Sequence, residues 1–291
     1  MTELCVVPCP LCGCESFAEV YADHPSSIVR CRSCDLAFFN PQPTPEYLSR
    51  YYSSQEGYLP SAEVLIQNFR ERPEAMRQHV SSVMSRLYSF RTRQPQQRLL
   101  DVGCAYGFFL LVVREAGLEV QGVELSEETS RYAREQGVPV QTASLETAQL
   151  PDAAFDFITM DNMLEHTLDP STTLARAYAL LQPGGLAHVA VPNFDSLVSR
   201  ADNMHWKNKA WPNHLFYFTP KTLSLLMMKA GFEVVDHYTH VGENEYSHDQ
   251  RVVRDRLFLE KPEDVARAIG FLAQMGKGQE LVMIGRKPAA G

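Results

Sequence analysis

The sequence lacks several features that would point to particular classes of protein. No uninterrupted apolar stretch approaches the ~20 residues that span a bilayer. The first five residues have neither the basic start nor the apolar core of a signal peptide. Positive charge is not in excess, because 27 Lys and Arg face 35 Asp and Glu and give a formal net charge of −8. We therefore expect a cytoplasmic protein with no membrane partner and no nucleic-acid partner.

Cysteine is scarce beyond residue 34, because six of the seven cysteines lie in the first 34 residues. In a reducing compartment such clustering favours a metal site over disulfides. Two Cys-x-x-Cys pairs, with eighteen residues between them, are formed by Cys9, Cys12, Cys31 and Cys34. This spacing is typical of a structural zinc site, in which four thiolates close the coordination sphere and residues 17–29 form a hairpin. The alternative is a set of free thiols, which is how we interpret Cys5 and Cys14.

The chain divides into three predicted segments. With 291 residues, 45% of them hydrophobic and 21% charged, it can bury one large core and a small satellite. We expect a zinc ribbon in residues 1–44 and a helical connection in residues 45–97. Strands and helices alternate over residues 98–291, which predicts an α/β domain with a mostly parallel sheet. Insertions at residues 194–218 and 236–275 interrupt this domain.

Residues 99–110 read as a short apolar strand, a turn of small residues and the start of a helix. Gly103 and Gly107 suit a turn with unusual dihedral angles, and the helix behind it offers unpaired N–H groups to a ligand. Asp101 ends the strand and can accept hydrogen bonds from a cationic or hydroxylated ligand. The next strand ends at Glu124, about 20 residues after the turn, where nucleotide-binding βαβ units carry a ribose-binding acid. The G-x-G-x-x-G spacing is absent, which disfavours hydride transfer with a dinucleotide.

The pattern Asp-x-Gly-x-Ala-x-Gly at residues 101–107 resembles the class I S-adenosylmethionine (SAM)-dependent methyltransferases, which have a glycine in place of Ala105. Leu-Glu-His followed by Asp-Pro at residues 164–170 is similar to the same family. The resemblance implies a Rossmann-like fold with seven strands, the last of them antiparallel, and SAM as cofactor. The residues that it implies for cofactor binding are Asp101, Gly103, Ala105, Gly107, Glu124, Leu125, Ser144, Leu145, Asp161 and Asn162.

The amino-terminal segment carries a second resemblance. A cysteine ribbon leading into Phe-Phe-Asn-Pro-x-Pro at residues 38–43 resembles the amino-terminal module of methyltransferases that act on sugars and other metabolites. We expect helices over residues 45–52 and 62–90, the second interrupted at Pro73. In the family this segment lies across the mouth of the cofactor pocket. Its candidate ligand contacts are therefore Tyr51, Tyr52 and Tyr58. The alternative is that these tyrosines pack the ribbon against the core.

The first insertion is predicted to form the acceptor side. Both tryptophans lie in residues 194–218, beside two histidines and a run of aromatics. Aromatic walls with a few polar groups suit a small-molecule pocket, and a packed surface loop is the alternative. The candidate acceptor contacts here are Trp211, Asn213 and Tyr217.

A histidine with a pKa near neutrality is a suitable general base for methyl transfer. His214 is the first candidate, because the resembling sugar methyltransferases carry a His-Leu/Val-x-Tyr-Phe-Ser/Thr motif there. His166 is the second candidate, although it alternatively only caps a helix. Some sugar C-methyltransferases have a glutamate directly before the motif histidine. Asn213 stands at that position here, which leaves O- or N-methylation open.

The second insertion, residues 236–275, carries three histidines and several acids. Their spacing matches no metal-ligand template, so we expect a solvated loop followed by an amphipathic helix over residues 263–275. His188, on an expected strand, is assigned no role.

Together these features predict a SAM-dependent methyltransferase with a structural Zn²⁺, acting as a monomer or homodimer. The expected acceptor is a small molecule, namely a sugar, a nucleotide-sugar or a secondary metabolite. The alternative is a catalytically inactive protein of the same fold that binds or scaffolds through its zinc ribbon.

Overall fold

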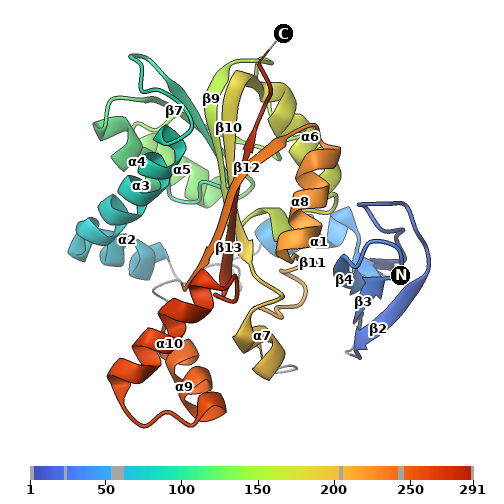
Figure 1. Ribbon diagram of the computed structural model, residues 1–291. Helices are drawn as coiled ribbons and strands as arrows, with labels where there is room; N and C mark the ends of the chain where they lie inside the picture. The colour runs from blue at the N-terminus through green and yellow to red at the C-terminus, as the bar shows by residue number, and fades with distance from the viewer. Residues whose placement is uncertain (1–2, 23–24, 54–61, 203–205, 242–245, 290–291) are drawn as a thin grey trace.

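A twisted seven-stranded sheet organises the chain (Figure 1). The computed structural model describes residues 3–22, 25–53, 62–202, 206–241 and 246–289, without the side chains of residues 49, 52, 53, 62, 63 and 246–248. In spatial order the strands are β12 (Glu233–His240), β13 (Glu280–Arg286), β10 (Leu181–Pro192), β9 (Phe155–Asp161), β6 (Arg98–Val102), β7 (Glu119–Glu124) and β8 (Val140–Thr142). Strand β13 runs antiparallel to both of its neighbours, and the pairings among β10, β9, β6, β7 and β8 are parallel. The predicted α/β fold with an antiparallel last strand is confirmed.

Successive residues of the central strands point to opposite faces of the sheet, and both faces are covered by helices. Leu99 and Phe157 pack in the core under α3 (Pro73–Tyr88), α4 (Phe108–Glu115) and α5 (Glu127–Glu135). Leu100 and Ile158, one position further along each strand, pack under α6 (Pro170–Leu180) and α8 (Pro220–Lys229). This explains why the central strands read as nearly continuous apolar runs.

The amino-terminal ribbon is completed by a distant part of the chain. Strands β2 (Phe17–Tyr21), β3 (Ser27–Cys31) and β4 (Ala37–Asn40) form the predicted hairpin and one strand more. Strand β11 (Phe216–Tyr217), from the first insertion, pairs with β4 as the fourth strand. A two-stranded ladder of β1 (Leu4–Cys5) and β5 (Gln42–Pro43) lies beside it.

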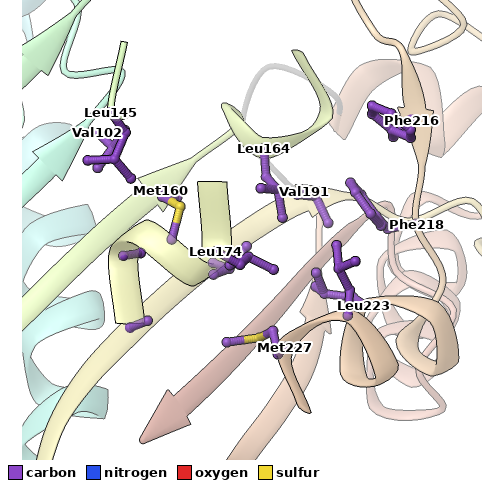
Figure 2. Close-up of a cluster of buried hydrophobic side chains, with 14 of the residues drawn as sticks. Val102, Leu145, Met160, Leu164, Leu174, Val191, Phe216, Phe218, Leu223 and Met227 are labelled. Atoms are coloured by element: carbon purple, nitrogen blue, oxygen red, sulfur yellow. The ribbon is translucent and has the colours of Figure 1, made fainter. Parts of the chain in front are cut away.

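The ribbon and the α/β domain share one hydrophobic core. The buried side chains run from Val102 and Leu145 past Leu174 to Phe216 and Phe218 (Figure 2). The same cluster includes the ribbon residues Cys9, Leu11, Cys31, Cys34, Leu36 and Phe38. The predicted boundary at residue 44 therefore does not mark an independent core.

The helical connection forms three helices, α1 (Pro45–Ser53), α2 (Ala62–Glu71) and α3. Pro73 opens α3, where its missing N–H costs no helical hydrogen bond. Helix α2 is held over the α/β domain by the ring of Phe69, which stacks on Phe108 with centroids 4.2 Å apart. The predicted helices and the break between them are confirmed.

The prediction of a solvated loop after residue 236 is wrong. Strand β12 continues to His240, so His237 and His240 lie on an edge strand, where polar side chains are tolerated. Helices α9 (Tyr246–Leu257) and α10 (Pro262–Gln274) then form a hairpin that projects beyond one end of the sheet (Figure 1). Val253 packs there against Val265 and Ile269. The side chain of His248 lies outside the described residues.

Two short helices complete the architecture, α7 (Leu197–Asp202) in the first insertion and a 3-10 turn at Leu164–His166. Within the described part of the chain, no helix is both long and apolar enough to cross a membrane.

Candidate functional site

The turn after β6 has the backbone that its glycines predict. Gly103 has φ +78°, and a Cβ there would lie 2.7 Å from Cγ of Met163. Gly107 has φ +74°, and a Cβ there would lie 2.9 Å from Cβ of Ala133. Both positions therefore require glycine, because the dihedral angles and the space exclude a side chain.

Ala105 occupies the same left-handed region, with φ +44°. A left-handed conformation costs an L-residue about 1–2 kcal/mol, so this departure from the family pattern carries strain.

Ala105→Gly is expected to raise the free energy of unfolding by about 0.5 kcal/mol, because the relieved strain exceeds the added entropy of the unfolded chain. Urea denaturation measures the change. Ala116→Gly is the matched control, since Ala116 has an ordinary φ of −78° and its replacement should destabilise the protein. A loss of stability in Ala105→Gly as large as that of the control would contradict the strain.

The two acids predicted from the sequence flank this turn, and both are buried. Asp101 Oδ1 accepts a hydrogen bond of 2.6 Å from Thr159 Oγ1. Glu124 holds the turn directly: its Oε2 accepts from the Ala105 N–H at 2.9 Å, and its Oε1 accepts from the Ser126 N–H at 2.8 Å. Burial raises the pKa of Glu124 above its usual range and that of Asp101 to about 7.

Leu125, Ser144 and Leu145 lie on the Glu124 side of the turn. The side chain of Leu125 is 55% exposed and gives this side an open apolar surface. Ser144 lies at a hydrogen-bonding distance of 3.1 Å from the Thr147 hydroxyl. Leu145 is buried and points into the core (Figure 2). Contact between these residues and adenine stays a prediction.

On the other side of the turn, a cavity of 510 Å³ opens between the sheet and helices α2 and α3. The sheet contributes Asp101, Thr159, Asp161 and His188 to its walls, the turn contributes Gly103 and Ala105, and the helical connection contributes Asn68, Arg72 and His79. The helical connection therefore covers a pocket beside the turn, as the family resemblance implies. The residues that do so come from α2, α3 and the link between them.

Asp161 is joined to the helical connection by a hydrogen bond. His79 Nε2 lies 2.9 Å from Asp161 Oδ2. Burial acts to lower the pKa of His79, but the hydrogen bond and the negative charge of Asp161 raise it above its ordinary value. Asn162 Nδ2 donates to Asp161 Oδ1 at 3.1 Å and to Glu280 Oε1 at 3.2 Å. Asn162 is not among the residues that line the cavity.

His79 and His188 were not expected at this site. His79 lies on a helix whose sequence carries no cofactor motif. His188 could have been predicted from the sequence, because it is a polar residue within an apolar strand. The parallel sheet aligns it with Thr159 and Asp101.

The two predicted catalytic histidines form a separate cluster. The rings of His166 and His214 are perpendicular, with centroids 4.7 Å apart, and His166 Nδ1 lies 2.9 Å from the Asn213 carbonyl oxygen. Burial lowers the pKa of both histidines, that of His214 to about 3. Neither lines the 510 Å³ cavity.

Glu165, which the sequence did not single out, lies beside these histidines. It is fully buried, and its Oε1 lies 3.8 Å from His166 Nε2. Among the described residues, neither carboxylate oxygen has a hydrogen-bond donor. The structure thus supplies a carboxylate next to the histidine pair, although Asn213 occupies the position where some sugar C-methyltransferases carry glutamate.

The aromatic residues of the first insertion pack against the ribbon. Trp211 meets Phe39 edge to face, with centroids 4.9 Å apart. Tyr217 is 2% exposed and contacts Phe39 and Phe194. These contacts agree with the packed alternative for this insertion, and acceptor binding by Trp211, Asn213 and Tyr217 stays a prediction.

Of the three tyrosines predicted to contact ligand, Tyr51 is the one whose side chain the structure describes. Tyr51, on α1, is half-buried and does not line the cavity. The side chain of Tyr52 and the whole of Tyr58 lie outside the described residues.

The four ribbon cysteines converge. Their sulfur atoms all lie within 4.8 Å of one another, with Cys9–Cys34 and Cys12–Cys31 each at 3.5 Å. A tetrahedral zinc with Zn–S bonds of about 2.3 Å needs sulfurs about 3.8 Å apart. Burial raises the pKa of the Cys9 thiol to about 11, so a nearby cation is needed to hold it as a thiolate.

Two matching turns build this cluster. The Gly13 N–H donates to the Cys9 carbonyl, and the Asp35 N–H donates to the Cys31 carbonyl. Gly13 and Asp35 both have positive φ, at +74° and +68°. The residues present therefore fit a tetrahedral ion, and Cys5 and Cys14 lie outside the set.

Comparison with known proteins identifies the family to which this chain belongs. A family model described as a methyltransferase domain matches residues 70–237, more than half of the chain. The chain belongs to this family. The predicted resemblance to class I SAM-dependent methyltransferases is thereby confirmed. The matched range of the methyltransferase domain begins in α2 and ends in β12, so it contains the turn and most of the residues that line the cavity, although Asn68 precedes it. Strands β1 to β5 of the ribbon and the α9–α10 hairpin lie outside the range.

Individual relatives match part of the chain. A ubiquinone biosynthesis O-methyltransferase from Aeromonas salmonicida is 30% identical over 154 residues, which cover 48% of this chain and 64% of the relative. An uncharacterized 37.1 kDa transposon protein from Streptomyces fradiae is 29% identical over 195 residues, covering 62% and 55%. The chain thus spans less than two thirds of the length of these relatives.

Solved structures share the fold. A SAM-dependent methyltransferase from Archaeoglobus fulgidus superposes with a TM-score of 0.55 and 21% identity, over 78% of this chain and all of the other. A putative sarcosine dimethylglycine methyltransferase from Galdieria sulphuraria gives 0.53 and 18%, over 75% and 88%. At these identities the likeness concerns the fold alone.

Proposed function

We propose that this protein transfers a methyl group from SAM to a small-molecule acceptor. The observation that carries the proposal is the turn at residues 103–107, held by Glu124 and opening into a cavity that Asp101 and Asp161 line. In open α/β sheets, ligands bind beyond the carboxyl ends of parallel strands, where these acids lie.

When bound, SAM supplies a methyl group activated by its sulfonium, and the residues of the chain provide position and charge. Glu124 retains lone pairs for the two ribose hydroxyls while it holds the turn, because an ionised carboxylate offers about four acceptor sites. The exposed face of Leu125 suits the adenine ring. Helices α2 and α3 exclude water from the reacting part of the cofactor.

The acceptor is proposed to be a sugar, a nucleotide-sugar or a secondary metabolite. The names of the ubiquinone relatives support hydroxyl methylation of a metabolite. His214, with His166 second, is the proposed general base, on the strength of its motif position and of Glu165 beside it. Because burial lowers the pKa of both histidines, this role requires the bound acceptor or an ionised Glu165 to raise the pKa toward neutrality. The cytoplasmic location, the lack of nucleic-acid and membrane partners, and the monomeric or homodimeric state stay predictions.

We further infer that Cys9, Cys12, Cys31 and Cys34 hold a structural Zn²⁺. The sulfur spacing and the two matching turns support this. Because four protein ligands leave no open coordination position, the metal takes no part in the reaction.

The affinity for S-adenosylhomocysteine (SAH), the demethylated product, is expected to rise about tenfold between pH 6 and pH 8. The reason is that burial raises the pKa of Asp101 to about 7, and only its ionised form attracts the cationic amine of the ligand. Calorimetric titration across this range measures the effect.

Other groups near Asp101 also carry charge, namely Asp161, His79 and Glu124. Asp161 raises the pKa of His79, and a charged His79 offsets part of the negative charge around the cavity. Asp101→Asn isolates the contribution of Asp101, since any pH dependence that survives in this variant belongs to the other groups. An affinity that falls with rising pH would contradict the role of Asp101.

The non-catalytic alternative is tested by product formation. Protein and SAM are incubated with a panel of hydroxyl and amine acceptors, and released SAH is quantified, with Glu124→Ala as the blank. We expect SAH above the blank with at least one class of acceptor. Tight SAM binding without SAH release from any of them would favour the scaffold alternative.

A further inference from the structure

A buried row of polar side chains crosses the sheet beneath α3. The register pairs Asp101 with Thr159 and Thr159 with His188 on strands β6, β9 and β10. Two residues earlier on the same three strands, Leu99, Phe157 and Leu186 form an apolar row within the core under α3. The sheet face thus changes from apolar to polar where the cavity begins.

His188 lacks the side-chain hydrogen bond that the other two members of this row make with each other. It is 2% exposed, and within the described residues neither ring nitrogen has a hydrogen-bond partner. Thr159 and Asp101 already bond to each other at 2.6 Å. Buried polar atoms are nearly always paired, so an unpartnered imidazole on a cavity wall indicates a ligand.

The charges around the cavity select the kind of ligand group. Asp101 and Asp161 line it near His188, and both carboxylates disfavour an anion. His79 bridges to Asp161 from the opposite wall. The row therefore suits a cationic hydrogen-bond donor. Arg72, which lines the cavity from the helical side, suits an anion on the same ligand.

We propose that His188, with Asp101, binds the α-ammonium group of the methionine tail of SAM. The inference rests on the proposed function and assigns a residue on β10 to recognition of the amino-acid end of the cofactor. The neutral imidazole accepts an N–H of the ammonium, and the Asp101 carboxylate supplies the compensating charge. The adenosine end is left to Glu124 and Leu125, on the other side of the turn.

The test compares two ligands that differ in this tail, SAH and 5′-methylthioadenosine, which lacks the amino-acid group. By calorimetric titration, His188→Leu should weaken SAH binding about tenfold, the equivalent of one hydrogen bond to a charged group. Its affinity for 5′-methylthioadenosine should change less than twofold. His237→Leu, at an exposed position on β12, is the matched control and should alter neither affinity.

The deaminated analogue of SAH provides a second comparison. Removing the amine should cost the wild type more than about tenfold in affinity, since it removes the contacts of both His188 and Asp101. The cost in His188→Leu should be about tenfold smaller, because that variant has already lost one of the two contacts. If His188→Leu does not fold, His188→Asn replaces it and should show a smaller loss that is again confined to SAH.

Three results would overturn the proposal. Equal losses for SAH and 5′-methylthioadenosine would make His188 structural, and unchanged affinities for both would remove it from the site. Either of these two results, with SAH bound tightly by the wild type, leaves the proposed function intact and rejects only this inference. Failure of the wild type to bind SAH rejects both.

Discussion

Glu124→Ala is expected to weaken SAH binding at least about 100-fold, which corresponds to about 2.7 kcal/mol. The carboxylate accepts the N–H groups of Ala105 and Ser126, and hydrogen bonds to charged groups contribute about 1.5–3 kcal/mol each. The substitution therefore removes both the ribose acceptor and the support of the turn. Calorimetric titration of SAH measures the loss.

Two further variants separate charge from position. Glu124→Gln keeps the size of the side chain, but it can accept with only one oxygen, and we expect an intermediate loss. Glu128→Ala removes an exposed acid from the first turn of α5 and should change the affinity less than twofold. Binding by Glu124→Ala within threefold of the wild type would show that Glu124 is not the anchor of the cofactor.

Cys31→Ser is expected to abolish zinc binding and to lower the melting temperature by about 10 °C. Cys31 is fully buried and belongs both to the cysteine cluster and to the core shared with the α/β domain. Loss of the metal removes several kcal/mol from the free energy of unfolding. Each kcal/mol lost lowers the melting temperature of a domain of this size by about 2–4 °C. Elemental analysis and calorimetry measure the two effects.

Cys5→Ser serves as the control, because Cys5 lies outside the cluster. It should retain one zinc per chain and the wild-type melting temperature. A wild-type protein that is folded and free of metal would contradict the zinc site. Packing in the shared core would then be the sole source of the stability of the ribbon.

The sequence predicted those parts of the fold that depend on local pattern. The strands β6, β9 and β10 read as mainly apolar runs, and Gly103 and Gly107 fit only a turn with positive φ. The cysteine spacing likewise predicted a cluster whose sulfur atoms the structure brings together. In each case a short stretch of residues is enough to meet the requirement, whether of backbone conformation or of metal coordination.

What the sequence did not predict depends on long-range pairing. Strand β11 is only two residues long, and its partner β4 lies about 180 residues earlier in the sequence. No local pattern therefore predicts their pairing. The same pairing explains why Tyr217, expected on the acceptor side, is packed against Phe39. The sequence predicted a loop from residue 236 onward, where β12 in fact continues, because the polar residues of an edge strand resemble those of a loop.

The candidate site shows the same division. Asp101 and Glu124 were found because they follow strands at fixed distances from the glycine turn. His79 reaches the cavity from a helix, and Glu165 meets His214 only because residue 165 lies opposite the first insertion, where the Leu215 N–H donates to its carbonyl. Such neighbours follow from tertiary packing and not from any spacing along the chain.

Titration of the wild-type protein with SAH tests the central claim most directly. The geometry of the turn, of Glu124 and of the adjoining cavity predicts saturable binding at micromolar concentrations, with NAD giving no heat under the same conditions. Absence of SAH binding at millimolar concentration, in a protein shown to be folded, would contradict the assignment of this turn as a cofactor site.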